Sequence, residues 1–165
     1  MLALPKFRTF RSSVIFSAVV GAVLAQRHFG MGLVLVLLIL APWVVVSAAT
    51  AYGRPEQRSI LVARICIWVV MCALVVGWHF YLHQTTRTKA QEIVDKVLAF
   101  QRSTGAFPEN LLMVGITDEE RKQLLGLSFY RREERDATLV YASTYMTFET
   151  EQYSFSTRRW AHVYD

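Results

Sequence analysis

Residues 65–98 read ICIWVVMCALVVGWHFYLHQTTRTKAQEIVDKVL, and the composition changes abruptly within this stretch. No Asp, Glu, Lys or Arg occurs from Ile65 to Leu82, whereas charged residues recur regularly after Gln84. A helix rises about 1.5 Å per residue and the hydrocarbon core of a bilayer is roughly 30 Å thick, so the apolar part is long enough to span a membrane. We therefore expect a membrane anchor at residues 1–83 and an extramembrane domain at residues 84–165.

Two further apolar runs precede this one, from Ser12 to Gln26 and from Met31 to Tyr52. The first is shorter than the usual 17 to 25 or so residues of a span, but Arg8, Arg11 and Arg27 at its ends can extend toward the headgroups. We expect three transmembrane helices. Two remain possible, with the first run lying on the membrane surface.

Basic residues near the ends of the runs bear on orientation, because cytoplasmic loops carry an excess of Lys and Arg. With three spans, the C-terminal domain lies outside, and the basic residues on the inside are Lys6, Arg8, Arg11, Arg54 and Arg58. With two spans the domain lies in the cytoplasm, and the charge count alone slightly favours this alternative. The apolar character of residues 14–25 favours burial beside the next helix, so we expect three spans and an outward-facing domain.

The ends of the runs also supply candidate membrane-interface residues. The third run closes with aromatic side chains, and Trp and Tyr are enriched at both membrane surfaces. The residues predicted to lie at the interface are Arg8, Arg11, Arg58, Trp78 and Tyr81.

The domain after Gln84 is predicted to begin with an amphipathic helix. Its apolar stripe has helical spacing and consists of Ala90, Ile93, Val94, Val97 and Leu98. Gly105 and Pro108 predict the end of this helix. Thr117 and Glu120 have the spacing of a capping box, which predicts a second, short helix that ends at Gly126.

The remaining residues predict a small antiparallel sheet. Strands are expected at residues 127–130, 138–143, 152–155 and 160–164, with a hairpin turn at 156–159. Aromatic side chains alternate along the last two strands, so one sheet face is aromatic and is expected to pack on the amphipathic helix; a ligand platform is the alternative. The predicted fold class is a helical membrane anchor plus a small α+β domain, in which a long N-terminal helix packs on an antiparallel sheet.

The sequence shows no pattern typical of catalysis or metal binding. His79 and His83 share one helix face, but two ligands without a third do not make a metal site. Cys66 and Cys72 point to different faces of one helix and cannot bridge within it. No phosphate-binding glycine loop or nucleophile elbow occurs, so we expect a protein that is not an enzyme and has no cofactor. No basic stripe interleaved with aromatics occurs either, which argues against nucleic-acid binding.

The densest charged segment is a candidate for contact with a protein partner. It consists of Arg131, Arg132, Glu133, Glu134 and Arg135. We expect an exposed loop here, where charges steer association. Trp160 is the further candidate interaction residue.

The order of features from about Ile60 onward resembles type IV pilins and type II secretion pseudopilins. A membrane helix runs into an amphipathic helix, and then AFQRSTGAFPENLL (residues 99–112) leads into the predicted sheet. Gly105-Ala106-Phe107-Pro108 matches the Gly–x–aromatic–Pro turn that often ends the long helix of those proteins, although no prepilin cleavage motif precedes Ile60. The closing YSFSTRRWAHVYD also resembles the end of small bacterial membrane-anchored domains. The resemblance implies a pilin-like α+β domain that faces outward.

These observations predict a multi-pass bacterial inner-membrane protein that presents a small periplasmic interaction domain. Its expected partners are the lipid bilayer and a protein. One version is an immunity protein that guards against a secreted toxin. The alternative is an assembly or docking component of a type II secretion or type IV pilus-like apparatus, and a membrane enzyme is the third hypothesis.

Overall fold

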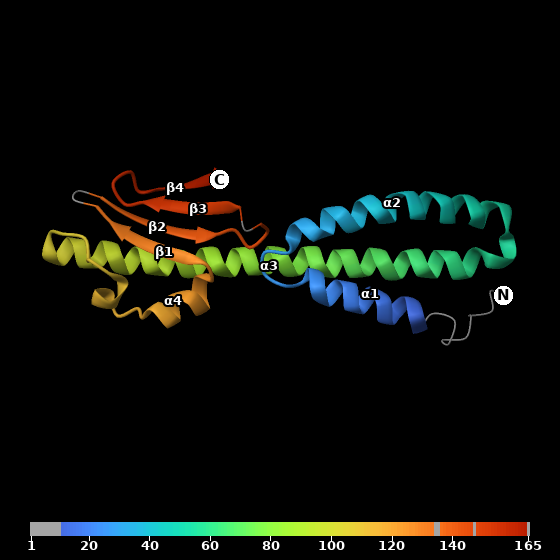
Figure 1. Ribbon diagram of the computed structural model, residues 1–165, viewed down its shortest axis with the longest axis horizontal. Helices are drawn as coiled ribbons and strands as arrows, with labels where there is room; N and C mark the ends of the chain where they lie inside the picture. Colours follow the sequence, from blue (N-terminus) through green and yellow to red (C-terminus); the bar gives the residue numbers. More distant parts are fainter. Residues whose placement is uncertain (1–10, 134–135, 147, 165) are drawn as a thin grey trace. The chain divides into compact units, whose positions relative to one another are not determined.

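The computed structural model describes residues 11–133, 136–146 and 148–164 (Figure 1). The chain divides into two compact units, an N-terminal unit (Met1–Phe80) and a C-terminal unit (Tyr81–Asp165). Helix α3 (Arg58–Thr104) contributes residues to both units. Three of the predicted interface and interaction residues, Arg8, Glu134 and Arg135, lie outside the described residues.

The N-terminal unit consists of α1 (Arg11–Leu24), α2 (Gly30–Gly53), a 3-10 turn (Pro55–Gln57) and the first part of α3. Among the described residues, two helices, α2 and α3, are long and apolar enough to cross a membrane. The 14 residues of α1 reach only about 21 Å, less than the hydrocarbon thickness of about 30 Å. The structure therefore supports two candidate spans, and the expectation of three is corrected because the described length of α1 is too short.

Helix α1 runs in the same direction as α3 within this unit. The ring centroid of Phe16 lies 5.9 Å from that of Trp68. Gly21 packs closely on Met71, because a Cβ atom at position 21 would lie only 3.0 Å from Cγ of Met71. Further along, the carbonyl oxygen of Leu24 lies 2.8 Å from Nε2 of His79. Residue numbers rise together in both helices, so α1 lies parallel to the apolar part of α3.

The C-terminal unit combines the second part of α3 with a four-stranded antiparallel sheet. Between them lie a 3-10 turn (Leu111–Val114) and α4 (Asp118–Leu125). The strands pair in sequence order and are β1 (Ser128–Arg132), β2 (Ala137–Ala142), β3 (Glu149–Ser154) and β4 (Arg159–Tyr164). The predicted combination of helix and antiparallel sheet is confirmed.

Local signals in the sequence explain where the helices of this unit begin and end. Helix α3 ends at Thr104, and Gly105 follows with a φ of 78°, a conformation that glycine adopts without strain. The hydroxyl of Thr117 accepts a hydrogen bond from the backbone N–H of Glu120 at 3.1 Å, which caps α4 as predicted. Gly126 ends α4 and donates its backbone N–H to the carbonyl of Lys122.

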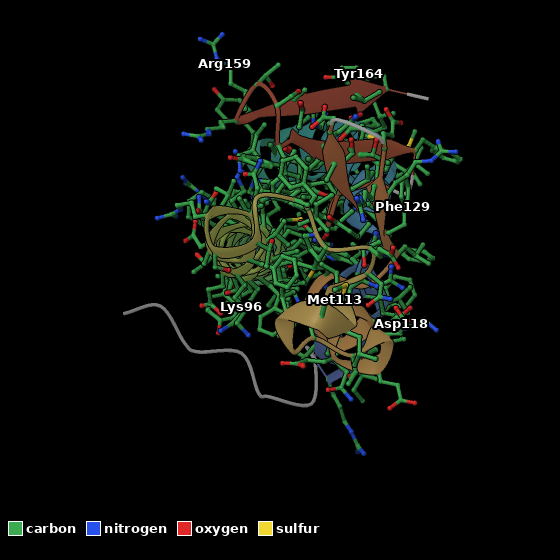
Figure 2. All side chains as sticks on the ribbon, turned by 90° about the vertical axis from the view of Figure 1, so that its left-hand side faces the viewer. Lys96, Met113, Asp118, Phe129, Arg159 and Tyr164 are labelled. Carbon is green, nitrogen blue, oxygen red and sulfur yellow. The ribbon has the colours of Figure 1, made fainter. Side chains whose placement is uncertain are left out.

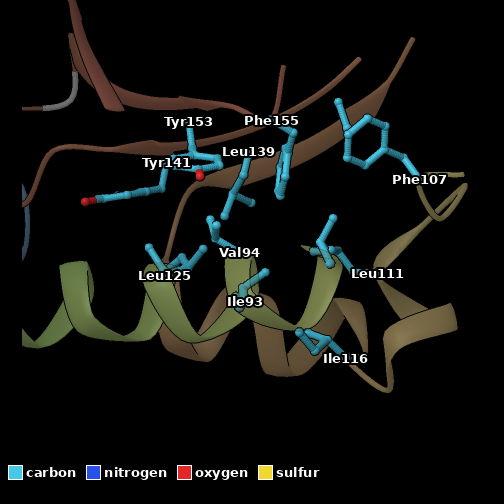
Figure 3. Close-up of a cluster of buried hydrophobic side chains, with 13 residues drawn as sticks. Ile93, Val94, Phe107, Leu111, Ile116, Leu125, Leu139, Tyr141, Tyr153 and Phe155 are labelled. Carbon is cyan, nitrogen blue, oxygen red and sulfur yellow. The ribbon is translucent and has the colours of Figure 1, made fainter. Parts of the chain in front are cut away.

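The hydrophobic core of this unit lies between α3 and one face of the sheet (Figure 3). The predicted stripe is confirmed, since Ile93 and Val94 are fully buried against the strands. The predicted aromatic face is also present, because Tyr153 and Phe155 pack edge to face with their ring centroids 4.9 Å apart. The opposite sheet face points away from α3 and carries the exposed Phe129 (Figure 2).

Candidate functional site

Polar side chains gather on the inner face of the sheet beside α3. Strand register places Glu151 of β3 between Tyr141 of β2 and His162 of β4. Side chains alternate along a strand, so Glu149 shares this face with Glu151. Helix α3 places Arg87 opposite them, and these residues form what we call the charged cluster: Arg87, Glu149, Glu151 and His162.

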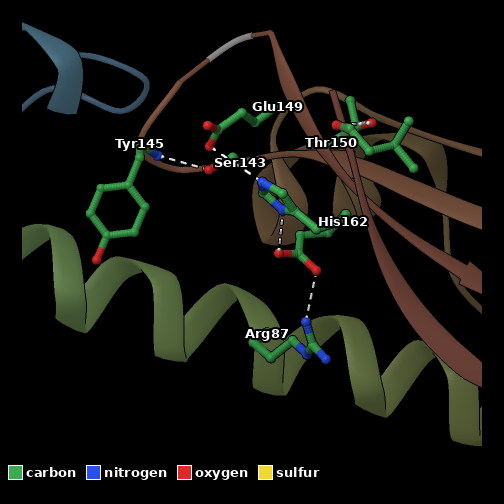
Figure 4. Close-up of polar contacts among 8 residues, drawn as sticks. Arg87, Ser143, Tyr145, Glu149, Thr150 and His162 are labelled. Atoms are coloured by element: carbon green, nitrogen blue, oxygen red, sulfur yellow. Dashed lines mark hydrogen bonds and ion pairs between the residues drawn. The ribbon is translucent and has the colours of Figure 1, made fainter. Parts of the chain in front are cut away.

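The members of the charged cluster pair with one another (Figure 4). Nη1 of Arg87 donates to Oε2 of Glu151 at 2.8 Å, and Oε1 of the same carboxylate lies 3.0 Å from Nδ1 of His162. Nε2 of His162 lies 3.6 Å from Oε2 of Glu149. Glu151 is only 8% exposed, and a buried carboxylate is costly unless it is paired. The cluster satisfies this requirement and ties α3 to the last two strands.

Trp160 extends the cluster toward the core. The guanidinium carbon of Arg87 lies 4.5 Å from the centre of the Trp160 ring, a cation–π geometry. The indole N–H donates to Oε1 of Gln91 at 3.0 Å. The ring also meets those of Tyr141 and Tyr153 edge to face. The structure thus places the predicted interaction residue Trp160 in a half-buried position against α3.

The tyrosine nearest the cluster remains a neutral phenol over the physiological range. Burial, and then the charge of Glu151, raise the pKa of Tyr141 to about 12, while the guanidinium of Arg87 acts in the opposite direction. A phenol with this pKa is a poor base and nucleophile at neutral pH.

The cluster holds acid–base groups, but its geometry favours a structural role. Both carboxylates lie against His162, and Glu151 also binds Arg87. A described pocket of the C-terminal unit lies elsewhere, lined by residues between Asn110 and Glu119. Within the ranges that the structure describes, no group of three or more His, Cys, Asp or Glu side chains is placed to hold a metal ion.

The charged segment was expected to be a loop, but its first two residues belong to β1, because Arg131 and Arg132 pair with residues of β2. Arg131 and Arg132 are exposed, and Glu133 donates its backbone N–H to the carbonyl of Asp136 at 2.8 Å, which closes the β1–β2 hairpin. Nη1 of Arg132 lies 3.7 Å from Oε1 of Glu109, a loose surface pair.

Successive contacts show how the sheet lies along α3. His83 meets the ring of Tyr145 at 5.6 Å, Arg87 binds Glu151, and Gln91 binds Trp160. The β2–β3 loop therefore lies at the start of the α3 segment in this unit. Because β2 runs toward that loop, the β1–β2 hairpin lies at the opposite end of the sheet.

The described membrane-interface residues lie in the N-terminal unit and at its border. Arg11, Arg58 and Tyr81 are exposed. Trp78 is also exposed, and it donates its indole N–H to the carbonyl of Ala25 at 2.9 Å.

Sequence reasoning missed two arrangements. The sequence shows that His79 shares a helix face with His83, but not that His79 is buried and contacts the carbonyl of Leu24. The alternation of Glu149 and Glu151 along one strand was visible in the sequence, but their partners were not. The pattern Glu–x–Glu on one strand and His on the next could have predicted the charged cluster. It does so only when the pairing register of the two strands is known.

Comparison of the chain with protein-family models, with curated proteins and with solved structures found no match.

Proposed function

We propose that the chain is a membrane-anchored protein-interaction module. Helices α2 and α3 form the anchor, and the β1–β2 hairpin contacts a protein partner. The observation that carries this proposal is the contrast between two sets of charges. The buried carboxylate of Glu151 is paired on both sides, whereas Arg131 and Arg132 are exposed on the hairpin.

The position of the hairpin supports this role. It lies at the end of the sheet opposite Tyr145, and Tyr145 contacts α3 directly after its apolar stretch. Within the C-terminal unit, the hairpin therefore lies at the end of the sheet away from the residues that directly follow the apolar stretch. Exposed charges at the rim of an interface accelerate association and select partners.

We further propose that the C-terminal unit faces the periplasm of a bacterial inner membrane. The parallel packing of α1 on α3 puts Arg11 toward the end of the N-terminal unit that also holds Arg54 and Arg58. Arg27 lies in the loop at the other end. Arg87 and Lys89 follow the apolar stretch of α3 on the side of Arg27, so these basic residues number three on each side and favour neither. The outward orientation is therefore proposed from the resemblance to pilin-like domains.

Two kinds of protein partner fit this arrangement. An immunity protein meets a secreted toxin through a small exposed domain on an anchor. An assembly component of a pilus-like or type II secretion apparatus uses a pilin-like helix for docking. The pilin-like proposal rests on the continuous 47-residue α3, apolar first and amphipathic later, and on the antiparallel sheet against its second part.

Site-specific photo-crosslinking in cells tests the interaction proposal. A crosslinker at residue 131 is expected to give a defined protein adduct, and the substitution Arg132→Glu is expected to remove it. The matched control carries the crosslinker at Lys96, an exposed residue on the side of α3 away from the sheet (Figure 2). The same adduct from both positions, or no adduct from residue 131 in a correctly inserted protein, contradicts the proposal.

A second set of variants tests the enzyme alternative. Glu149→Gln combined with His162→Gln removes two acid–base groups but keeps the bond between Arg87 and Glu151. The adduct at residue 131 is expected to persist in this variant. A folded variant that loses its cellular effect while Arg132→Glu keeps it would favour catalysis at the cluster.

A further inference from the structure

We propose that an aromatic rim of the C-terminal unit lies in the headgroup region of the lipid bilayer. The rim consists of Tyr145, Phe148 and Tyr164. This inference rests on the proposed membrane anchoring and goes beyond it, because it assigns a lipid-binding surface to the domain that carries the sheet.

The continuity of α3 places one end of this domain at the membrane surface. Residues 65–82 are uncharged, and α3 continues without a break through His83 to Thr104. At about 1.5 Å per residue, His83 lies within a few ångströms of the end of the apolar stretch. The ring of Tyr145 lies 5.6 Å from that of His83, so the β2–β3 loop lies at the same level. Figure 4 shows Tyr145 beside α3.

Two of the most exposed aromatic side chains lie at this end of the sheet. Phe148, directly before β3, is 69% exposed, and Tyr164, paired with Glu149 in the register, is 74% exposed. Aromatic side chains are favoured at the membrane–water interface, where an apolar ring and a polar tip both find suitable surroundings. Contact with lipid headgroups therefore accounts for exposure that is unfavourable in water.

Charge at this end of the sheet is compatible with lipid headgroups. Glu149 and Glu151 lie close to the rim, and uncompensated carboxylates there would be repelled by anionic lipids. His162 lies against both, and Arg87 binds the second. The charged cluster thus pairs these negative charges on the inner sheet face, where the ring of His162 also lies 4.8 Å from that of Tyr164.

Depth-resolved fluorescence on the full chain tests the rim. Cys66 and Cys72 are the two cysteines of the chain, so Cys66→Ala with Cys72→Ala provides a background for single labels. Phe148→Cys and Tyr164→Cys carry an environment-sensitive dye in vesicles of phosphatidylcholine and phosphatidylglycerol. Leu112→Cys is the matched control, because Leu112 is 65% exposed and follows the far end of α3 in the chain.

A chain with Cys72→Ala alone carries the same dye at Cys66, an exposed position within the apolar stretch, and reports on the anchor. We expect blue-shifted emission, quenching by doxyl-labelled lipid and protection from aqueous iodide at residues 148 and 164. The dye at residue 112 should show the opposite.

Iodide quenching at residues 148 and 164 equal to that at residue 112 overturns the rim, and so does lipid quenching at all three positions. In either case, lipid quenching at Cys66 leaves the proposed anchoring intact. Absence of lipid quenching at Cys66 contradicts the anchoring itself, and with it the rim. Circular dichroism confirms that each labelled variant is folded. If one of the two rim substitutions prevents folding, the other still tests the rim.

Discussion

The imidazole Nε2 of His79 lies 2.8 Å from the carbonyl oxygen of Leu24, so a side chain of α3 hydrogen-bonds to the backbone at the C-terminal end of α1. Trp78 does the same for the carbonyl of Ala25. The last carbonyls of a helix have no intrahelical donor, and within a bilayer they find little water. Two adjacent side chains of α3 therefore hold the end of α1 in place.

The substitution His79→Leu is expected to loosen α1. It leaves the carbonyl of Leu24 without this donor, and an unsatisfied buried polar group costs about 1–3 kcal/mol. The measurement is the melting temperature in detergent micelles. Phe80→Leu is the control, because Phe80 is exposed. Equal melting temperatures for His79→Leu and the wild type would show that the contact contributes nothing to stability.

Reporter fusions are expected to place the C-terminal unit outside the cytoplasm. Alkaline phosphatase fused after Asp165 should be active, and the same enzyme fused after Arg54 should be inactive, because the two positions are separated by the α3 span. A cytoplasmic reporter should give the opposite pattern. The reverse result would place the sheet domain in the cytoplasm and exclude a periplasmic partner.

A double-mutant cycle is expected to reveal coupling between Arg87 and Glu151. Loss of a charged hydrogen bond costs about 1.5–3 kcal/mol, and the partial exposure of the Arg87 side chain moves the expectation to the lower end of this range. Arg87→Met and Glu151→Gln should therefore each destabilise the protein, and the double variant should cost less than their sum. Strict additivity in urea unfolding would mean that the pair is not coupled.

Asp136 is expected to contribute to stability in a pH-dependent way. Burial alone raises its pKa, but hydrogen bonds from Ser156, Ala137 and Ser154 outweigh burial and hold the pKa below its usual range. As the pH falls, Asp136 is therefore protonated at a higher pH in the unfolded chain than in the folded one. The stabilisation is fully present above about pH 4, the ordinary Asp pKa, and is lost as the pH falls through the lower folded pKa.

Asp136→Asn should lower the free energy of unfolding at neutral pH by about 1–2 kcal/mol. The difference from the wild type should shrink below about pH 4. Asp95→Asn, at an exposed residue of α3, is the control. A difference that stays constant from neutral to acidic pH would contradict the assigned role of Asp136.

The isolated C-terminal unit, residues 81–165, is expected to fold, because its core lies between α3 and the sheet of the same unit. Trp160→Ala should then cost roughly 2–4 kcal/mol, somewhat below the value for a fully buried ring, since Trp160 is half-buried. Trp160→Phe should recover most of the loss because the edge-to-face contacts remain. A melting temperature that is insensitive to Trp160→Ala would mark the ring as available for a partner.

Local sequence determined much of this fold. The apolar runs predicted α2 and the first part of α3, because their length and lack of charge suit a bilayer. Helical spacing predicted the buried stripe that includes Ile93 and Val94, and Gly105 and Thr117 marked where α3 ends and α4 begins. Each of these signals arises within a few residues, where backbone conformation and side-chain periodicity act directly.

Tertiary structure alone decided the pairs that define the candidate sites. His79 and Leu24 are 55 residues apart, Arg87 and Glu151 are 64 apart, and Gln91 and Trp160 are 69 apart. The sequence shows that these groups need hydrogen-bond partners, but for each group it offers several side chains that could be the partner. Strand register and the direction in which α1 packs on α3 determine the choice, because they bring one competitor within bonding distance and leave the others out of reach.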